Sequence, residues 1–198
     1  MTTSPLAALP IEFLGSFPDP AQPLHPVRPE IAFVGRSNVG KSSLLNALVG
    51  SRGLARVSST PGKTQHLNVY GLPACYLVDL PGYGWARAAK RDREKYRALV
   101  DTYIRHRPTL RGVVWLLDVR HPPSTDDRRM QELLVETGRP VLTVLTKVDK
   151  LPQARRQAAI RERVADLGLT LDDVHPTSSS TGQGIADLGE SILAACTD

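Results

Sequence analysis

Residues 35–42 read Gly-Arg-Ser-Asn-Val-Gly-Lys-Ser and directly follow the apolar run Ile-Ala-Phe-Val at residues 31–34. This string fits the pattern G-x-x-x-x-G-K-[ST], in which a buried strand ends in a glycine-rich turn and a helix begins. Backbone N–H groups in such a turn surround phosphate oxygens, and the dipole of the following helix attracts anions. Leucines at positions 44, 45 and 48 then share one helical face, with Gly50 where a C-terminal cap is expected. The stretch therefore predicts a phosphate-binding loop, the P-loop, in an α/β domain.

Four residues of the P-loop have separate expected roles. Gly35 and Gly40 allow backbone angles that a Cβ atom would forbid. The Lys41 ammonium is expected to reach the β and γ phosphates of a nucleotide, and the Ser42 hydroxyl to ligate a magnesium ion. A P-loop alone is compatible with ATPases, kinases and GTPases, so the choice among them depends on later motifs.

The length of 198 residues favours a single domain, because it allows one substantial core but not two enzyme-sized ones. The composition, with 41% hydrophobic and 23% charged residues, is ordinary for a folded protein and excludes disorder throughout. Residues 2–29 hold seven of the sixteen prolines, which excludes a long helix there. We expect residues 1–29 to form a Pro-rich N-terminal extension, in which only 11–17 can pair as a strand, and residues 30–198 to form the domain.

Short apolar runs alternate with helical patterns after residue 30, which is typical of a sheet covered by helices on both faces. The link at residues 71–73 is so short that its two flanking strands must form an antiparallel hairpin, so we expect a mixed, mostly parallel sheet. The six expected strands lie at residues 31–34, 67–70, 75–79, 113–118, 141–145 and near 174. Helices are expected around residues 41–49, 96–104, 130–134, 160–164 and 185–192.

Cysteine usage and apolar runs bear on the compartment. Cys75 and Cys196 have no metal-ligand spacing, and we expect both to be buried, reduced thiols. The N-terminus lacks a basic residue before an apolar core, and the longest apolar stretch, residues 113–117, is too short to span a bilayer. We therefore expect a cytoplasmic protein with no membrane partner. We also expect the protein to be a monomer.

The segment Leu-Val-Asp-Leu-Pro-Gly at residues 77–82 predicts a strand that ends in D-x-x-G. The Asp79 carboxylate can hold a magnesium ion through a water molecule, and the Gly82 amide can contact the γ phosphate. Taken alone, an Asp before Pro-Gly is more often a simple turn. After a P-loop, the segment predicts a sensor of the γ phosphate.

The base is expected to be read by Thr-Lys-Val-Asp at residues 146–149, which follow a predicted strand and have the form [NT]-K-x-D. The Asp149 carboxylate can accept hydrogen bonds from N1–H and the exocyclic amine of guanine, a donor pair that adenine lacks. The aliphatic stem of Lys147 can lie along the base. Three serines at residues 178–180 precede a predicted helix, where backbone amides can meet the guanine oxygen. This set favours GTP over ATP.

Between the P-loop and D-x-x-G lies Ser-Ser-Thr-Pro-Gly-Lys-Thr-Gln at residues 58–65, which is rich in turn formers. We expect Thr64 to complete the magnesium shell. A loop that γ phosphate orders and hydrolysis releases provides a two-state switch.

In combination these motifs resemble those of the EngB (YihA/YsxC) family, one of the TrmE-Era-EngA-EngB-Septin-like GTPases. The likeness runs from about Pro29 to the C-terminal helix and rests on residues 35–46, 61–65, 79–84, 107–108, 118–122 and 146–151. It implies a P-loop NTPase fold of the Ras-like GTPase kind, with GTP or GDP as ligand and Mg²⁺ as cofactor. It also implies a role in assembly of the large ribosomal subunit, linked to normal cell division and septation.

Tyr83 follows the D-x-x-G motif, where Ras-like enzymes place the glutamine that orients the attacking water. A phenol does not readily take that role. We therefore expect GTP hydrolysis to GDP and phosphate that is slow without a partner or a monovalent cation.

Asn38 lies within the P-loop, where related potassium-activated GTPases use an asparagine to ligate a monovalent cation. A potassium ion there would offset charge that develops on the phosphates, much as an arginine finger does. The alternative is a loop asparagine that makes a local turn bond.

The expected site residues fall into three overlapping groups. The candidate catalytic residues are Lys41, Thr64 and Asn38, and the candidate metal ligands are Ser42 and Thr64. The candidate nucleotide-binding residues are Gly35, Arg36, Ser37, Asn38, Val39, Gly40, Lys41, Ser42, Gly62, Lys63, Thr64, Gln65, His66, Asp79, Leu80, Pro81, Gly82, Thr146, Lys147, Val148, Asp149, Ser178, Ser179 and Ser180.

The segment from Arg87 to Arg107 carries eight basic residues against three acidic ones, an excess that equals the +5 net charge of the chain. We expect it to bind ribosomal RNA phosphates, with contacts that supply affinity rather than sequence choice. Trp85 and Tyr83 are the best-placed aromatics for base stacking, although both also suit packing. A solvated helix face is the alternative for the whole segment.

Two other functions compete with a GTP-hydrolysing assembly factor. One is a GTP-gated binding module in which hydrolysis is incidental, an alternative that Tyr83 keeps open. The other is an ATP-dependent kinase with the same P-loop, which Thr-Lys-Val-Asp at residues 146–149 disfavours.

Overall fold

The structure is a computed structural model and describes residues 3–51, 53–55, 66–84 and 90–197. In this part of the chain seven strands form one sheet in the order β1-β3-β4-β2-β5-β6-β7. Strands β4, β2, β5, β6 and β7 are mutually parallel, whereas β1 pairs with β3 and β3 with β4 in antiparallel fashion. The strands are β1 (Glu12–Phe17), β2 (Glu30–Gly35), β3 (Leu67–Gly71), β4 (Tyr76–Asp79), β5 (Leu110–Asp118), β6 (Val141–Thr146) and β7 (Val174–Pro176).

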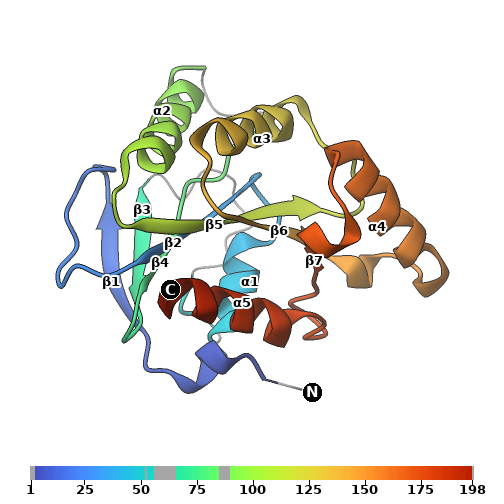
Figure 1. Cartoon of the computed structure of the whole chain (residues 1–198), viewed down its shortest axis with the longest axis horizontal. Helices are drawn as coiled ribbons and strands as arrows, with labels where there is room; N and C mark the ends of the chain where they lie inside the picture. The colour runs from blue at the N-terminus through green and yellow to red at the C-terminus, as the bar shows by residue number, and fades with distance from the viewer. Residues whose placement is uncertain (1–2, 52, 56–65, 85–89, 198) are drawn as a thin grey trace.

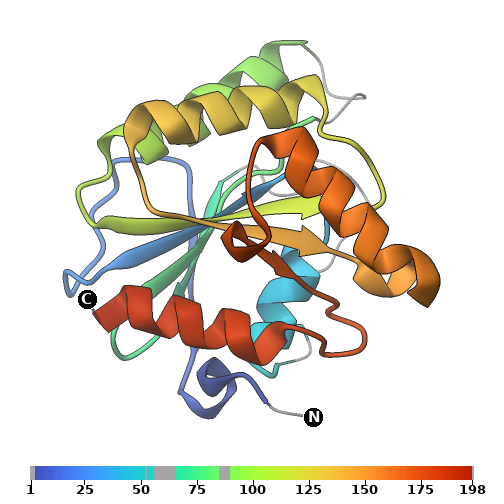
Figure 2. The same ribbon diagram turned by 45° about the vertical axis from the view of Figure 1, so that its right-hand side comes forward.

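Five α-helices of the described chain cover both faces of the sheet (Figure 1). Helices α2, α3 and α4 pack on one face, and α1 and α5 pack on the other, as the turned view in Figure 2 also shows. The helices are α1 (Lys41–Leu48), α2 (Lys90–His106), α3 (Thr125–Thr137), α4 (Gln153–Leu167) and α5 (Ile185–Thr197), with short 3₁₀ helices η1 (Pro5–Ala8), η2 (Val148–Lys150) and η3 (Leu171–Asp173).

The expected α/β fold is confirmed, and each of the six predicted strands is present. The number of strands was wrong, because the segment Glu12–Phe17 pairs with β3 and adds a seventh at the edge. This segment lies in the Pro-rich extension but contains no proline itself, so each of its N–H groups is available for pairing. Leu6, in η1, is also buried, in the cluster that α1 and α5 form. The extension is therefore packed onto the domain along much of its length.

The two central strands explain why the sheet has helices on both faces. All six residues of β2 are buried, and seven of the nine residues of β5 are buried as well. A strand that is apolar on both faces needs cover on both sides. The carboxyl end of β2 is thereby held at the centre of the sheet edge, directly beside the ends of β4 and β5.

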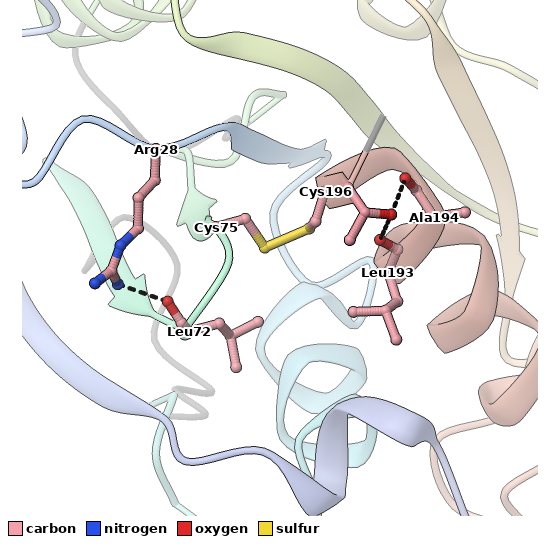
Figure 3. Close-up of a disulfide and its surroundings, with 7 residues drawn as sticks. Arg28, Leu72, Cys75, Leu193, Ala194 and Cys196 are labelled. Atoms are coloured by element: carbon pink, nitrogen blue, oxygen red, sulfur yellow. Dashed lines mark hydrogen bonds between the residues drawn. A yellow bond between two sulfur atoms is a disulfide. The ribbon is translucent and has the colours of Figure 1, made fainter.

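The expectation of two reduced thiols was wrong. Cys75 and Cys196 form a disulfide with their Cα atoms 5.6 Å apart (Figure 3). It joins the residue before β4 to the end of α5, and both cysteines are buried as expected. The two positions are 121 residues apart in the chain, so only the packing of α5 against the sheet reveals that they meet.

Within the described residues, no helix combines the length and apolar character that crossing a bilayer requires.

Candidate nucleotide-binding site

The predicted motifs converge because the strands that carry them are parallel. The P-loop follows β2, Asp79 ends β4, Thr146 ends β6, and the serines at 178–180 follow β7. Parallel neighbours place their carboxyl ends at one edge of the sheet, which is where α/β folds bind ligands. Motifs more than one hundred residues apart in the chain thus meet at one edge.

The P-loop has the backbone shape that glycine and asparagine tolerate best. Gly40 has φ of 107°, and Asn38 is one of two described non-glycine residues with positive φ, at 65°. Gly40 is the N-cap of α1, and among the described residues no side chain caps the first turn. The N–H groups at the start of α1 are therefore free to bind an anion such as phosphate.

Lys41 and Asp79 form a buried ion pair at the foot of the P-loop, with 8% and 1% of each residue exposed. Burial of one member without the other would leave an unpaired charge, so each holds the other in place. Ser42 is the next residue of α1. A hydroxyl and a carboxylate are hard oxygen ligands, which suit a magnesium ion held directly or through water.

The D-x-x-G segment lies against the P-loop through its backbone. The Ser37 N–H donates to the Tyr83 carbonyl at 2.9 Å, and the Tyr83 N–H donates to the Gly35 carbonyl at 3.2 Å. A Cβ atom on Gly82 would lie 3.1 Å from the backbone of Ser37, tighter than most real contacts. A side chain at position 82 would therefore push the two loops apart by a few tenths of an ångström.

The Tyr83 side chain is half-buried and packs against the hydrophobic core. Its hydroxyl donates to Asp127 Oδ1 at 2.9 Å and accepts from Trp115 Nε1 at 2.9 Å. Asp127 also forms a capping box with Ser124 at the start of α3. Burial, and secondarily the Asp127 carboxylate, raise the pKa of Tyr83 well above its usual value. The phenol is therefore a neutral structural link between the D-x-x-G segment and α3.

The expected base-binding residues line a cavity of about 670 Å³ between α1, the end of β6 and the loop after β7. The Ser178 hydroxyl donates to Asp149 Oδ1 at 2.7 Å, which orients the carboxylate. Burial raises the pKa of Asp149, but hydrogen bonds from Ser178 and Ser180 outweigh it and lower the pKa to about 2. The carboxylate is thus ionised and oriented, as an acceptor for two guanine donors must be.

Thr146 and Lys147 connect the base-binding segment to the P-loop. The Thr146 hydroxyl donates to the Val39 carbonyl at 2.8 Å, and Lys147 Nζ donates to the Asn38 carbonyl at 2.6 Å. Lys147 is the second described non-glycine residue with positive φ, at 63°. The two loops are therefore one bonded unit.

Some expected site residues do not present a side chain at this edge. Leu80 and Val148 are fully buried in the core, so only their backbone groups are available to a ligand. Four expected site residues lie outside the described residues, namely Gly62, Lys63, Thr64 and Gln65. His66 is exposed and immediately precedes β3, whose first residues pair with the end of β4.

Asp118 is a site residue that the motif analysis did not select. It ends β5, and its Oδ2 lies 3.1 Å from Lys147 Nζ. Arg120 binds the same carboxylate through Nε and Nη2 at 2.9 and 2.7 Å. An available clue was that β4, β5 and β6 all end in a polar residue after an apolar run. Three parallel strands with polar ends indicate three contributions to one site.

In the proposed RNA-binding segment, Arg87 to Arg107, fewer basic side chains are available to bind RNA than the sequence indicates. Arg107 is 7% exposed and pairs with the buried Glu30 at 2.8 Å, so including it among RNA-binding residues was wrong. Arg105 pairs with Asp101 and Glu136, and Arg97 pairs with Asp126. Burial of Glu30 required a cation, and Arg107 is the one that satisfies it.

Comparison with known proteins identifies relatives over most of the chain. The family profile described as "50S ribosome-binding GTPase" matches residues 30–147. A "Probable GTP-binding protein EngB" of Gemmatimonas aurantiaca is 46% identical over 83% of this chain and 81% of its own length. The protein of the same description in Desulfatibacillum aliphaticivorans is 44% identical over 93% of this chain and 91% of its own.

Solved structures share the fold. A crystal structure of a probable GTP-binding protein engB superposes with a TM-score of 0.70 at 23% identity, over 84% of this chain and 98% of that one. A crystal structure of Era with MgGDPNP and a segment of 16S ribosomal RNA has a TM-score of 0.68 at 24% identity, over 84% of this chain and 56% of that one.

Proposed function

The chain belongs to the EngB family of GTP-binding proteins, within the ribosome-binding GTPases, and from this we propose that it is a Mg²⁺-dependent GTP switch that assists assembly of the large ribosomal subunit. Its work is linked to normal cell division and septation, and it acts in the cytoplasm. Residues 30–198 are the GTPase domain, and residues 1–29 are an extension whose segments η1 and β1 pack onto it.

One observation carries the nucleotide assignment. A base-reading carboxylate, Asp149, and a phosphate-binding ion pair, Lys41–Asp79, stand at the same sheet edge, and Lys147 bridges their two loops. Guanine is the base that offers two adjacent donors to a single carboxylate. A nucleotide spanning the cavity and the P-loop therefore places guanine at Asp149 and its phosphates at the start of α1.

On the phosphate side, Lys41 would turn from Asp79 toward the β and γ phosphates, and Asp79, Ser42 and Thr64 are the residues that would hold a magnesium ion. When bound, such an ion would neutralise charge on the phosphates. Asn38 would hold a potassium ion beside the phosphates, and that ion would supply further positive charge. The Gly82 N–H detects the γ phosphate.

Hydrolysis by this site depends on a partner, because the Tyr83 hydroxyl is already bound to Asp127 and Trp115 and position 83 lacks the glutamine that orients the attacking water in Ras-like enzymes. The large subunit is the partner that completes the site, and hydrolysis releases the protein from it. The competing function, a GTP-gated binding module with incidental hydrolysis, is favoured by the same inward Tyr83. Both use GTP, and they differ only in whether hydrolysis responds to the partner.

Single-turnover hydrolysis, with protein in excess over labelled GTP, separates the two functions. We expect the rate with purified large subunits to exceed the rate of protein alone at least tenfold, and small subunits to have no such effect. Lys41→Ala serves as the control for contaminating GTPases, because it removes the phosphate-binding cation. An equal rate with and without large subunits would leave the GTP-gated module as the better description.

A further inference from the structure

Asp118 lies beside the base-binding segment because β5 and β6 are parallel neighbours. The two strands end in register, with Asp118 opposite Thr146, and Lys147 is the next residue. Contacts with Arg120 hold the Asp118 carboxylate in place independently of Lys147. Arg120 donates to it through Nε, through Nη2 and through its backbone N–H, the last at 3.1 Å. Such a bidentate guanidinium contact fixes the carboxylate plane.

Lys147 is held between this carboxylate and the P-loop. Its ammonium lies 3.1 Å from Asp118 Oδ2 and 2.6 Å from the Asn38 carbonyl oxygen. Its Cε atom lies 3.7 Å from the place where a Cβ atom on Gly40 would be, so the stem runs along the loop. The ammonium therefore has one acceptor from β5 and one from the P-loop.

The ion pair is shielded enough to matter energetically. The Asp118 side chain is 14% exposed and that of Lys147 is 27% exposed. Partly buried pairs of good geometry are screened less than surface pairs. Burial raises the pKa of Asp118, but the bonds from Arg120 and Lys147 outweigh it and lower the pKa to about 2, so the carboxylate is charged at every working pH.

We propose that Asp118 is a positioning residue that holds Lys147 against the P-loop and thereby sets how long a guanine nucleotide stays bound. The inference rests on the proposed function, because it concerns the base and phosphate contacts of the same site. A lysine that is held in place before binding loses less freedom when the nucleotide arrives. Without Asp118, Lys147 keeps only the Asn38 carbonyl and both loops loosen.

The test is the release rate of a fluorescent GDP, the N-methylanthraniloyl derivative, chased with excess GDP from the full chain in the oxidised state. We expect Asp118→Asn to accelerate release about tenfold, the change that loss of one charge-assisted hydrogen bond brings. GTP release should accelerate by the same factor, because both nucleotides share the base. Asp118→Glu should recover part of the loss, and Asp101→Asn, which breaks an ion pair on α2, should change nothing.

A double-mutant cycle distinguishes positioning from general loosening of the fold. In a Lys147→Ala background, Asp118→Asn should alter release less than twofold, because the residue it positions is already gone. An equal effect of Asp118→Asn in both backgrounds, or no effect in the wild type, would overturn the inference and leave the proposed function intact. Failure of the wild type to bind GDP at all would overturn both.

Discussion

At the scale of single residues, Asn38 combines a backbone of positive φ with a side chain that the pattern G-x-x-x-x-G-K-[ST] does not specify. Its φ of 65° suits asparagine or glycine, and its carbonyl is already bound by Lys147. The backbone of Asn38 thus has a structural role, which leaves the side-chain amide available for the proposed potassium ion. The two roles can be separated by substitution.

We predict that wild-type protein hydrolyses GTP faster in potassium than in sodium buffer, and that Asn38→Gly abolishes the difference. Glycine keeps the positive φ without strain, whereas Asn38→Ala adds a backbone cost of about 1–2 kcal/mol. Steady-state phosphate release in both salts measures the effect, and thermal unfolding checks that each variant is folded. Equal rates in the two salts for the wild type would rule out the cation.

Tyr83 is the second residue whose role the packing defines. We predict that Tyr83→Phe destabilises the protein by about 1–3 kcal/mol, because Trp115 Nε1 and Asp127 Oδ1 both lose the hydroxyl that they bind, while Asp127 keeps its bonds to Ser124. Single-turnover hydrolysis should change less than threefold. Urea unfolding gives the free energy, and the contrary result, normal stability with hydrolysis lost, would make the phenol part of the reaction.

At the scale of elements, α2 has a basic side that is only partly available to a partner. Arg91 and Lys95 are exposed, whereas Arg97 and Arg105 bind acids of α2 and α3, and Arg107, just past the helix, is buried on Glu30. Several of the basic side chains in the segment are therefore already paired with acids, and fewer of them are available to a partner than the sequence indicates. Those side chains are the ones to test against ribosomal RNA.

We predict that Arg91→Ala and Lys95→Ala weaken co-sedimentation with large ribosomal subunits, and that each lowers the salt dependence of log K by about 1. Arg155→Ala on α4, which removes another exposed cation at a different position, is the matched control. Binding that falls with salt identically for all three variants and in every nucleotide state would indicate nonspecific attraction to RNA alone.

The helices and strands of the structure show which features the sequence alone can predict. Periodicity and turn residues place β2 to β7 and the five helices correctly, because each is specified by neighbours within a few turns of chain. The pairing of Arg107 with Glu30, 77 residues apart, was out of reach, as was the inward path of Tyr83 to Asp127. Motif spacing likewise located the P-loop and Asp149, but Asp118 matters only because β5 and β6 end in register.

At the scale of the whole molecule, the disulfide joins the start of an interior strand of the sheet to the last helix. Cys75 stands before β4, which carries Asp79, and Cys196 ends α5, which follows the serines of the base-binding loop. Nearby, Arg28 also donates to the Leu72 carbonyl at 2.7 Å, in the hairpin between β3 and β4 (Figure 3). The start of β4 and the last helix are thus anchored to one another.

We predict that reduction of the Cys75–Cys196 bond lowers the free energy of unfolding by about 2–4 kcal/mol, because a long loop regains freedom in the unfolded chain. Urea unfolding with and without a reductant measures this change. In the double variant Cys75→Ser, Cys196→Ser the reductant should have no effect. A wild-type midpoint that does not respond to the reductant would mean that the bond does not constrain the unfolded chain.

The central claim is that this sheet edge reads guanine through Asp149, and competition binding with Asp149→Asn tests it most directly. The wild type should bind GDP at least a hundredfold more tightly than XDP or ADP, because only guanine places two donors at the carboxylate. The amide of the variant should weaken GDP binding and favour XDP, whose second carbonyl accepts a hydrogen bond. An unchanged preference for GDP in Asp149→Asn would contradict the account of the site.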